Sequence, residues 1–236
     1  MRRGLRGGAF PTVETRSSRI EPAAVSILGW QHQWVNITVN RKTIIPGKEG
    51  LPAVFTYSKA RAAGISAEPL YTYRNQGLVD QIGRGLYRWA DAPEIDQDLL
   101  EAAYRAPRAT LCLSTALARH GLTDAIPDRL DVAIPRGGRI PSLRQSVAIH
   151  VFASKTFDLG RDELKVGDGI SIGLYSAERS LIDVIRLRHT EGSDVAWEAL
   201  RQWLRRKGAK PAALLAMAKR FHGAEAAVRN ALEVVL

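Results

Sequence analysis

The sequence predicts an α+β protein: an N-terminal winged helix-turn-helix domain, then a mixed α/β segment, then a helical C-terminal end. Residues 57–75 contain two short helical patterns joined by a glycine turn, and two short strand patterns separated by Gly83-Arg84-Gly85 follow directly. Further along the chain, helical and strand patterns alternate up to residue 175, and only helical patterns follow. We therefore expect a basic N-terminal extension over 1–48, the winged helix-turn-helix over 49–92 and a C-terminal domain over 93–236.

The two helical patterns have recognisable ends. Ser58 is expected to cap the first helix, and Gly64 to end it, because glycine readily adopts the left-handed backbone that follows many helices. Ser66 is expected to cap a second helix from Ala67 to about Asn75. Pro69 would lie in its first turn, where the missing N–H group costs little.

The second helix is predicted to bury Leu70 and Tyr73, three residues apart, and to expose its other side chains. An α-helix fits the major groove of DNA, where polar side chains can reach base edges. The cation in the hairpin turn can reach a phosphate or the neighbouring minor groove. The expected DNA-binding residues are Ser66, Tyr71, Thr72, Arg74 and Asn75 on the helix, with Arg84 and Arg88 in the wing. The same pattern would also suit a winged helix that docks a protein partner.

A winged helix normally has one further helix before this pair. In this chain that place holds Pro46, Gly47, Gly50 and Pro52, which oppose a long helix. We therefore expect either a short first helix over about 50–55 or an unusual N-terminal region.

Charge and composition indicate a soluble protein with an anionic partner. Lys and Arg outnumber Asp and Glu by 34 to 24, a net charge of +10, but residues 93–190 are neutral overall. Cys112 is the only cysteine, which excludes an internal disulfide or a multi-cysteine zinc site and fits the cytoplasm. No stretch approaches the ~20 apolar residues of a membrane span, and no secretory signal is recognisable.

The C-terminal domain is predicted to contain these elements in order: a helix over 95–105 capped by Asp96, a short strand over 109–113, a helix capped by Ser114, strands over 130–135, 147–152 and 170–175, and four helices from 177 to the end, the first two capped by Ser176 and Ser193. Arg179 and Asp183 are spaced as i,i+4 partners on a helix. Such a pair is expected to contribute roughly 0.3 kcal/mol.

Sequence motifs give little sign of catalysis. The five histidines are dispersed, and no nucleotide-binding loop, nucleophile elbow or zinc-protease motif occurs. Glu163-Leu164-Lys165, with Asp158 or Asp162, imitates the carboxylate and lysine pattern of metal-dependent nucleases. It is expected in a charged loop, between Gly160 and Gly167. We expect no catalytic residue, no metal site, no cofactor and no enzyme activity.

A second glycine-rich stretch is Arg136-Gly137-Gly138-Arg139, between two predicted strands. Its glycines would let backbone N–H groups converge on a phosphate while the arginines supply charge. The alternative is a hairpin tip with solvated arginines.

Four stretches of the chain stand out together: GRGLY at 83–87, LSTALARHGL at 113–122, AIPRG at 133–137 and ERSLID at 178–183. In this order and spacing they resemble the AbiEi family of antitoxins from bacterial abortive-infection toxin–antitoxin pairs. The resemblance extends from about residue 55 to the C-terminus. The departure is the stretch before it, where prolines interrupt the expected first helix.

The resemblance implies that the N-terminal winged helix binds repeats in the operator DNA of the protein's own operon and represses it. It implies a C-terminal antitoxin domain that counteracts a nucleotidyltransferase-like toxin, directly or indirectly, with no membrane partner and no catalysis. The oligomeric state stays open, and a monomer binding DNA cooperatively is one compatible form. A plain transcriptional regulator without antitoxin activity is the alternative.

Overall fold

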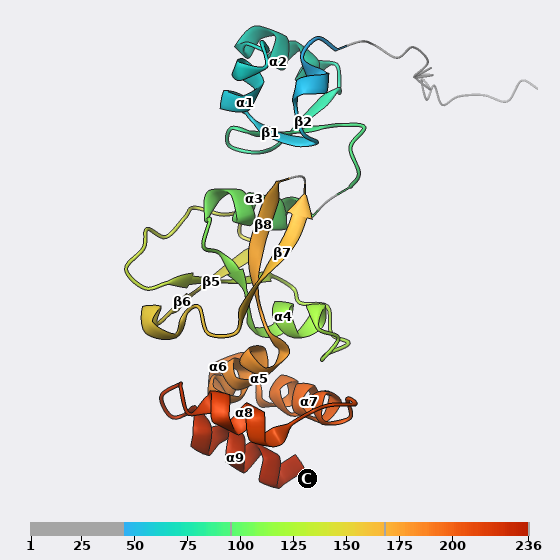
Figure 1. Ribbon diagram of the computed structural model, residues 1–236. Coiled ribbons are helices and arrows are strands. Elements are labelled where there is room, and N and C mark those ends of the chain that lie inside the picture. Colours follow the sequence, from blue (N-terminus) through green and yellow to red (C-terminus); the bar gives the residue numbers. More distant parts are fainter. Residues whose placement is uncertain (1–44, 95, 168, 236) are drawn as a thin grey trace, which may run out of the picture. The chain divides into compact units, whose positions relative to one another are not determined.

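The computed structural model describes residues 45–94, 96–167 and 169–235 (Figure 1). Contacts group Ile44–Leu236 into one compact unit, which is the part considered below. The predicted basic extension over 1–48 lies almost wholly outside the described residues.

The chain combines two sheets with helices that are partly segregated from the strands, which agrees with the predicted α+β class. The helices are α1 (Tyr57–Ala62), α2 (Ala67–Asn75), α3 (Gln97–Arg105), α4 (Leu113–Arg119), α5 (Ala177–Arg186), α6 (Arg188–Glu191), α7 (Ser193–Leu204), α8 (Pro211–Ala218) and α9 (Ala224–Val235), with 3-10 turns at Lys48–Gly50 and Ser154–Thr156. The strands are β1 (Val54–Thr56), β2 (Val79–Gly83), β3 (Leu86–Trp89), β4 (Thr110–Leu111), β5 (Leu130–Pro135), β6 (Val147–Phe152), β7 (Arg161–Gly167) and β8 (Ile170–Tyr175).

Residues 45–94, here called the N-terminal module, contain α1, α2 and an antiparallel sheet with the strand order β1-β3-β2. Leu70 of α2 is buried and Tyr73 is partly buried, as predicted; both belong to the core of the module, where the Tyr73 ring packs on Trp89. The predicted cap of α1 is wrong. Thr56, not Ser58, caps this helix, because its side-chain oxygen accepts a hydrogen bond from the Lys59 N–H.

The short first helix expected over about 50–55 does not form. Instead, Val54–Thr56 is strand β1, which pairs antiparallel with β3. The hairpin leaves one edge of β3 open, and β1 fills that edge while burying both Val54 and Phe55. Pro52, two residues before the strand, also opposes a helix here.

The second sheet has the strand order β6-β5-β4-β8-β7 and mixes both pairing directions. Strands β5 and β6 are parallel, as are β4 and β8, whereas β4–β5 and β7–β8 are antiparallel. Two expectations are therefore wrong. Arg136–Arg139 is not a hairpin tip, because parallel strands need a crossover, and residues 161–167 form strand β7 rather than a charged loop.

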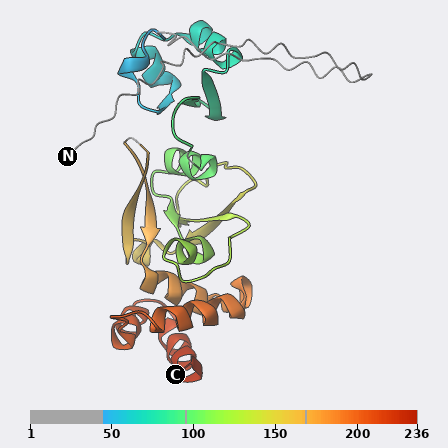
Figure 2. The same ribbon diagram turned by 90° about the vertical axis from the view of Figure 1, so that its right-hand side faces the viewer.

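Helices cover both faces of this sheet (Figure 2). Leu99 and Ala102 of α3 form one core with Val132. Leu117 of α4 forms another core with Ala133 and the helices α5 and α7–α9. Because neighbouring side chains on a strand point to opposite faces, α3 and the helical layer lie on opposite faces of the sheet.

Helix starts in this part agree only partly with the prediction. Asp96 and Ser176 accept backbone N–H groups at the starts of α3 and α5, as expected. Neither Ser114 nor Ser193 is a cap, since α4 begins at Leu113 and α7 begins at Ser193 itself. At the start of α4, the Oδ2 of Asp131 in β5 accepts the Thr115 N–H at 3.4 Å. A side chain distant in the sequence thus accepts a free N–H group of the first turn, where a local cap was expected.

Candidate nucleic-acid interface

One side of α2 carries polar side chains that the core leaves exposed. Tyr71 is 62 % exposed, and Thr72, Arg74 and Asn75 are also exposed, as is Gln76 just after the helix. The Thr72 hydroxyl donates to the Glu68 carbonyl at 3.1 Å, which leaves its oxygen lone pairs open to a donor. The short helix therefore offers hydrogen-bonding groups and an aromatic ring on one surface.

The turn between β2 and β3 presents Arg84. Gly85 has φ +74°, a backbone conformation that glycine adopts without strain, and its carbonyl accepts the Tyr57 N–H at 3.2 Å. This bond ties the turn to the start of α1. Among the residues that the structure describes, neither Arg74 nor Arg84 has an ion-pair or side-chain hydrogen-bond partner.

Arg88 is placed differently from its predicted role in contacting DNA. Its Nη2 donates to Asp80 Oδ2 at 3.0 Å and its Nη1 to the Pro93 carbonyl at 3.3 Å, and its side chain is only 12 % exposed. The pairing of β2 with β3 brings Asp80 opposite Arg88, and the carboxylate holds the guanidinium against the sheet. Arg88 thus stabilises the hairpin from within.

Ser66 is exposed at the N-cap position of α2, as predicted, but its side chain makes no cap hydrogen bond. Its hydroxyl is open to solvent. The predicted residues Tyr71, Thr72, Arg74, Asn75 and Arg84 are exposed too, whereas Arg88 is not.

Sequence reasoning missed two further exposed cations, Lys59 and Arg61 of α1. Only Ala60 of this helix is buried, so its neighbours on either side face solvent. In the sequence, the position of these two cations on either side of a small apolar residue could have indicated their exposure. Lys48, by contrast, pairs with Asp91 and lies over the Trp89 ring.

The nuclease pattern does not assemble into a metal site among the described residues, where no three His, Cys, Asp or Glu residues are placed to hold an ion. Glu163 accepts a hydrogen bond from the Ser171 hydroxyl on the neighbouring strand. Asp158 forms an ion pair with Arg108 at 2.9 Å. The two carboxylates therefore serve different partners.

Residues 52–90 match the family model described as a transcriptional regulator, AbiEi antitoxin. A search of curated proteins found no match. No helix within the described ranges combines the length and apolarity needed to cross a membrane. The matched segment contains β1, α1, α2 and the hairpin, and so the surface built above. The predicted resemblance to the AbiEi antitoxin family is thus confirmed, over residues 52–90.

Proposed function

We propose that the protein is a DNA-binding antitoxin that represses its own operon in the cytoplasm and counteracts a nucleotidyltransferase-like toxin. Residues 49–92 would be a winged helix-turn-helix that binds operator DNA, and residues 93–236 the antitoxin domain. The family described as AbiEi antitoxin transcriptional regulators supports the general role.

The observation that carries the DNA proposal is the exposed polar surface of α2 together with an exposed cation in the hairpin turn of the same module. Arg74 and Arg84 are exposed and have no carboxylate partner in the described part of the chain. An unpaired guanidinium can bond a guanine edge or a phosphate without first losing an internal ion pair. Lys59 and Arg61 add two further exposed cations to the same module.

The test is an anisotropy titration of the full chain on the duplex upstream of its own gene, with a scrambled duplex of equal length as competitor. We expect Arg74→Ala to lose affinity for the operator more than for the scrambled duplex, by roughly 1–3 kcal/mol. Equal loss on both duplexes would remove Arg74 from base reading.

Arg84→Ala should weaken both duplexes alike, because a phosphate contact carries no sequence information. The slope of log K against log salt should flatten by about 0.9 unit. Arg201→Ala is the matched control, since Arg201 is exposed on α7, pairs with no carboxylate in the described part of the chain, and changes the net charge equally when removed. An unchanged slope in Arg84→Ala, or the same change in Arg201→Ala, would contradict the wing contact.

The antitoxin part needs a separate experiment. The neighbouring toxin gene is induced with and without this protein, and growth is measured. Rescue by both wild type and Arg74→Ala would show antitoxin activity independent of operator reading. Absence of rescue together with operator binding would indicate a plain transcriptional regulator. No DNA binding at low salt would favour a module that docks protein.

A further inference from the structure

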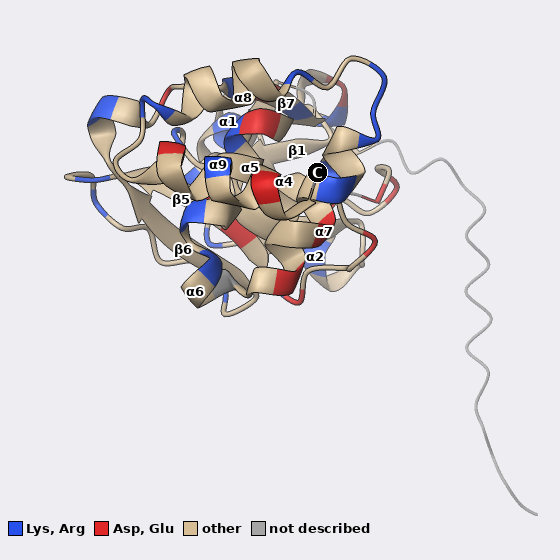
Figure 3. Cartoon of the chain, turned by 90° about the horizontal axis from the view of Figure 1, so that it is seen from below, with Lys and Arg blue, Asp and Glu red and all other residues tan. Residues whose placement is uncertain are grey.

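A cavity of about 730 Å³ lies where β5 and β6 end, between the sheet and the helical layer. Five of its lining residues are cations: Arg136, Lys155, Arg179, Arg186 and Arg220. None of the described residues that line it is Asp or Glu. Blue segments lie along the side of the ribbon where β6 and α6 are labelled (Figure 3).

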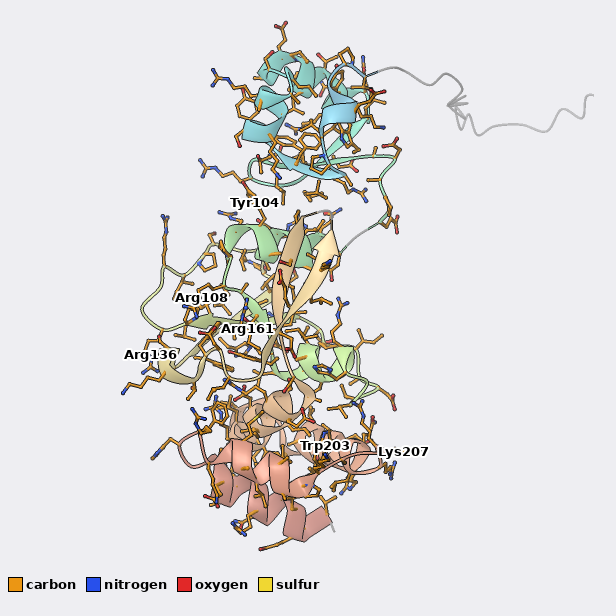
Figure 4. All side chains as sticks on the ribbon, in the orientation of Figure 1. Tyr104, Arg108, Arg136, Arg161, Trp203 and Lys207 are labelled. Atoms are coloured by element: carbon orange, nitrogen blue, oxygen red, sulfur yellow. The ribbon has the colours of Figure 1, made fainter. Side chains whose placement is uncertain are left out.

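Parallel pairing brings two of these cations to the same edge of the sheet. Arg136 directly follows β5, and Lys155 follows β6 by three residues. The Ser154 hydroxyl donates to the Arg136 carbonyl at 2.7 Å, and the Arg136 N–H donates to the Phe152 carbonyl at 2.8 Å. These hydrogen bonds fix the backbone that carries both side chains. Arg136 lies beside the turn after β6 (Figure 4).

Three of the cations have no ion-pair partner within the described residues: Arg136, Lys155 and Arg220. All three are exposed. Like charges gathered at one cavity repel one another, and no carboxylate of the described residues pairs with these three cations.

The other two cations share one buried carboxylate. Asp183 accepts Arg179 Nε at 2.8 Å through Oδ2 and Arg186 Nε at 2.9 Å through Oδ1, so both of its oxygens are engaged. Arg179 is fully buried, and its Nε and Nη1 donate to Asp183 and two backbone carbonyls. Its Nη2 has no acceptor among the described residues. The five cations thus keep an excess of four positive charges.

We propose that this cavity binds a small ligand through two or more phosphate groups. Guanidinium groups bind phosphate oxygens in pairs of parallel hydrogen bonds, and an anion would neutralise charge that the described residues leave uncompensated. The volume is typical of small-molecule sites. Arg179 lies at a concave, largely buried position, which suits a small molecule better than a duplex backbone. The phosphate groups could belong to an inorganic polyphosphate or to a nucleotide.

The test is isothermal titration calorimetry of the full chain with inorganic triphosphate and, separately, with ATP. We expect both to bind, and Arg136→Ala to weaken binding about tenfold or more, the usual effect of losing a hydrogen bond between charged groups. Arg139→Ala is the matched control, because Arg139 is exposed in the same turn but does not line this cavity. Lys155→Ala provides a second variant on a different element.

Tighter binding of ATP would assign the site to nucleotides, and equal affinity would assign it to the phosphate groups alone. Absence of binding by either probe, or equal weakening in Arg136→Ala and Arg139→Ala, would overturn the proposal. Displacement of triphosphate by short duplex DNA, lost in the same variants, would show that the cavity belongs to a DNA surface and would also overturn it. Thermal unfolding of each variant checks its fold, and operator binding is measured independently of all these outcomes.

Discussion

Replacing Asp183 by Asn removes one charge at nearly constant shape and should be strongly destabilising. As an i,i+4 pair on a solvated helix, Arg179 and Asp183 would contribute only roughly 0.3 kcal/mol. In the structure their side chains are 1 % and 0 % exposed, and Asp183 also holds Arg186. Removing the carboxylate leaves a buried guanidinium without its counter-ion, a change that typically costs about 3–5 kcal/mol.

The assay is urea unfolding followed by circular dichroism, with thermal melts alongside. For a unit of this size, such a loss corresponds to a fall in Tm on the order of 6–20 °C. Glu225→Gln is the matched control, because Glu225 and Arg229 are also i,i+4 partners, but their side chains are 39 % and 54 % exposed. That variant should lose no more than about 0.5 kcal/mol. A loss below about 1 kcal/mol in Asp183→Asn would refute the reasoning from burial.

Two further predictions concern residues near Asp183 in the chain. Tyr175 donates its hydroxyl to the Phe157 carbonyl at 2.8 Å, and Tyr175→Phe should cost about 1–3 kcal/mol at pH 7 by leaving that carbonyl unpaired, as measured by urea unfolding. Burial raises the pKa of Tyr175, so above pH ~10 the unfolded chain loses the proton while the folded chain keeps it. Wild type should therefore lose stability relative to Tyr175→Phe as the pH rises from 9 to 11, and a constant difference would contradict this. Gly173→Ala should lower the Tm, because the added Cβ would lie 2.5 Å from Thr110 Oγ1, whereas Gly138→Ala, at 3.5 Å from its nearest neighbour, should change it little.

Sequence reasoning succeeded for the N-terminal module because short-range chemistry determines its elements. Gly64 has a positive φ angle, the backbone expected after the first helix. The spacing of Leu70 and Tyr73 predicted the buried side of α2, and with it the exposed candidates. Strand β1 was missed, because three residues after a proline show no periodicity and only the open edge of β3 makes them a strand.

The candidate interface was predictable only in part. The exposure of Arg74 and Arg84 was predicted from their positions on a helix and in a turn. Arg88 looked equivalent to them in sequence, but its exposure depends on Asp80, which the hairpin register places opposite it. A guanidinium paired across strands cannot be distinguished from a free one by composition alone.

By itself the sequence determined the α+β class, the position of the helix-turn-helix pattern and most strands, because helix ends, turns and side-chain periodicity are local properties. Tertiary structure decided the rest through partners distant in the chain. The parallel pairing of β5 with β6 placed Arg136 beside Lys155 at one cavity instead of at a hairpin tip. Burial between the sheet and the helices turned the Arg179–Asp183 pair from a weak surface contact into a buried charge cluster, because desolvation depends on everything that surrounds a charge.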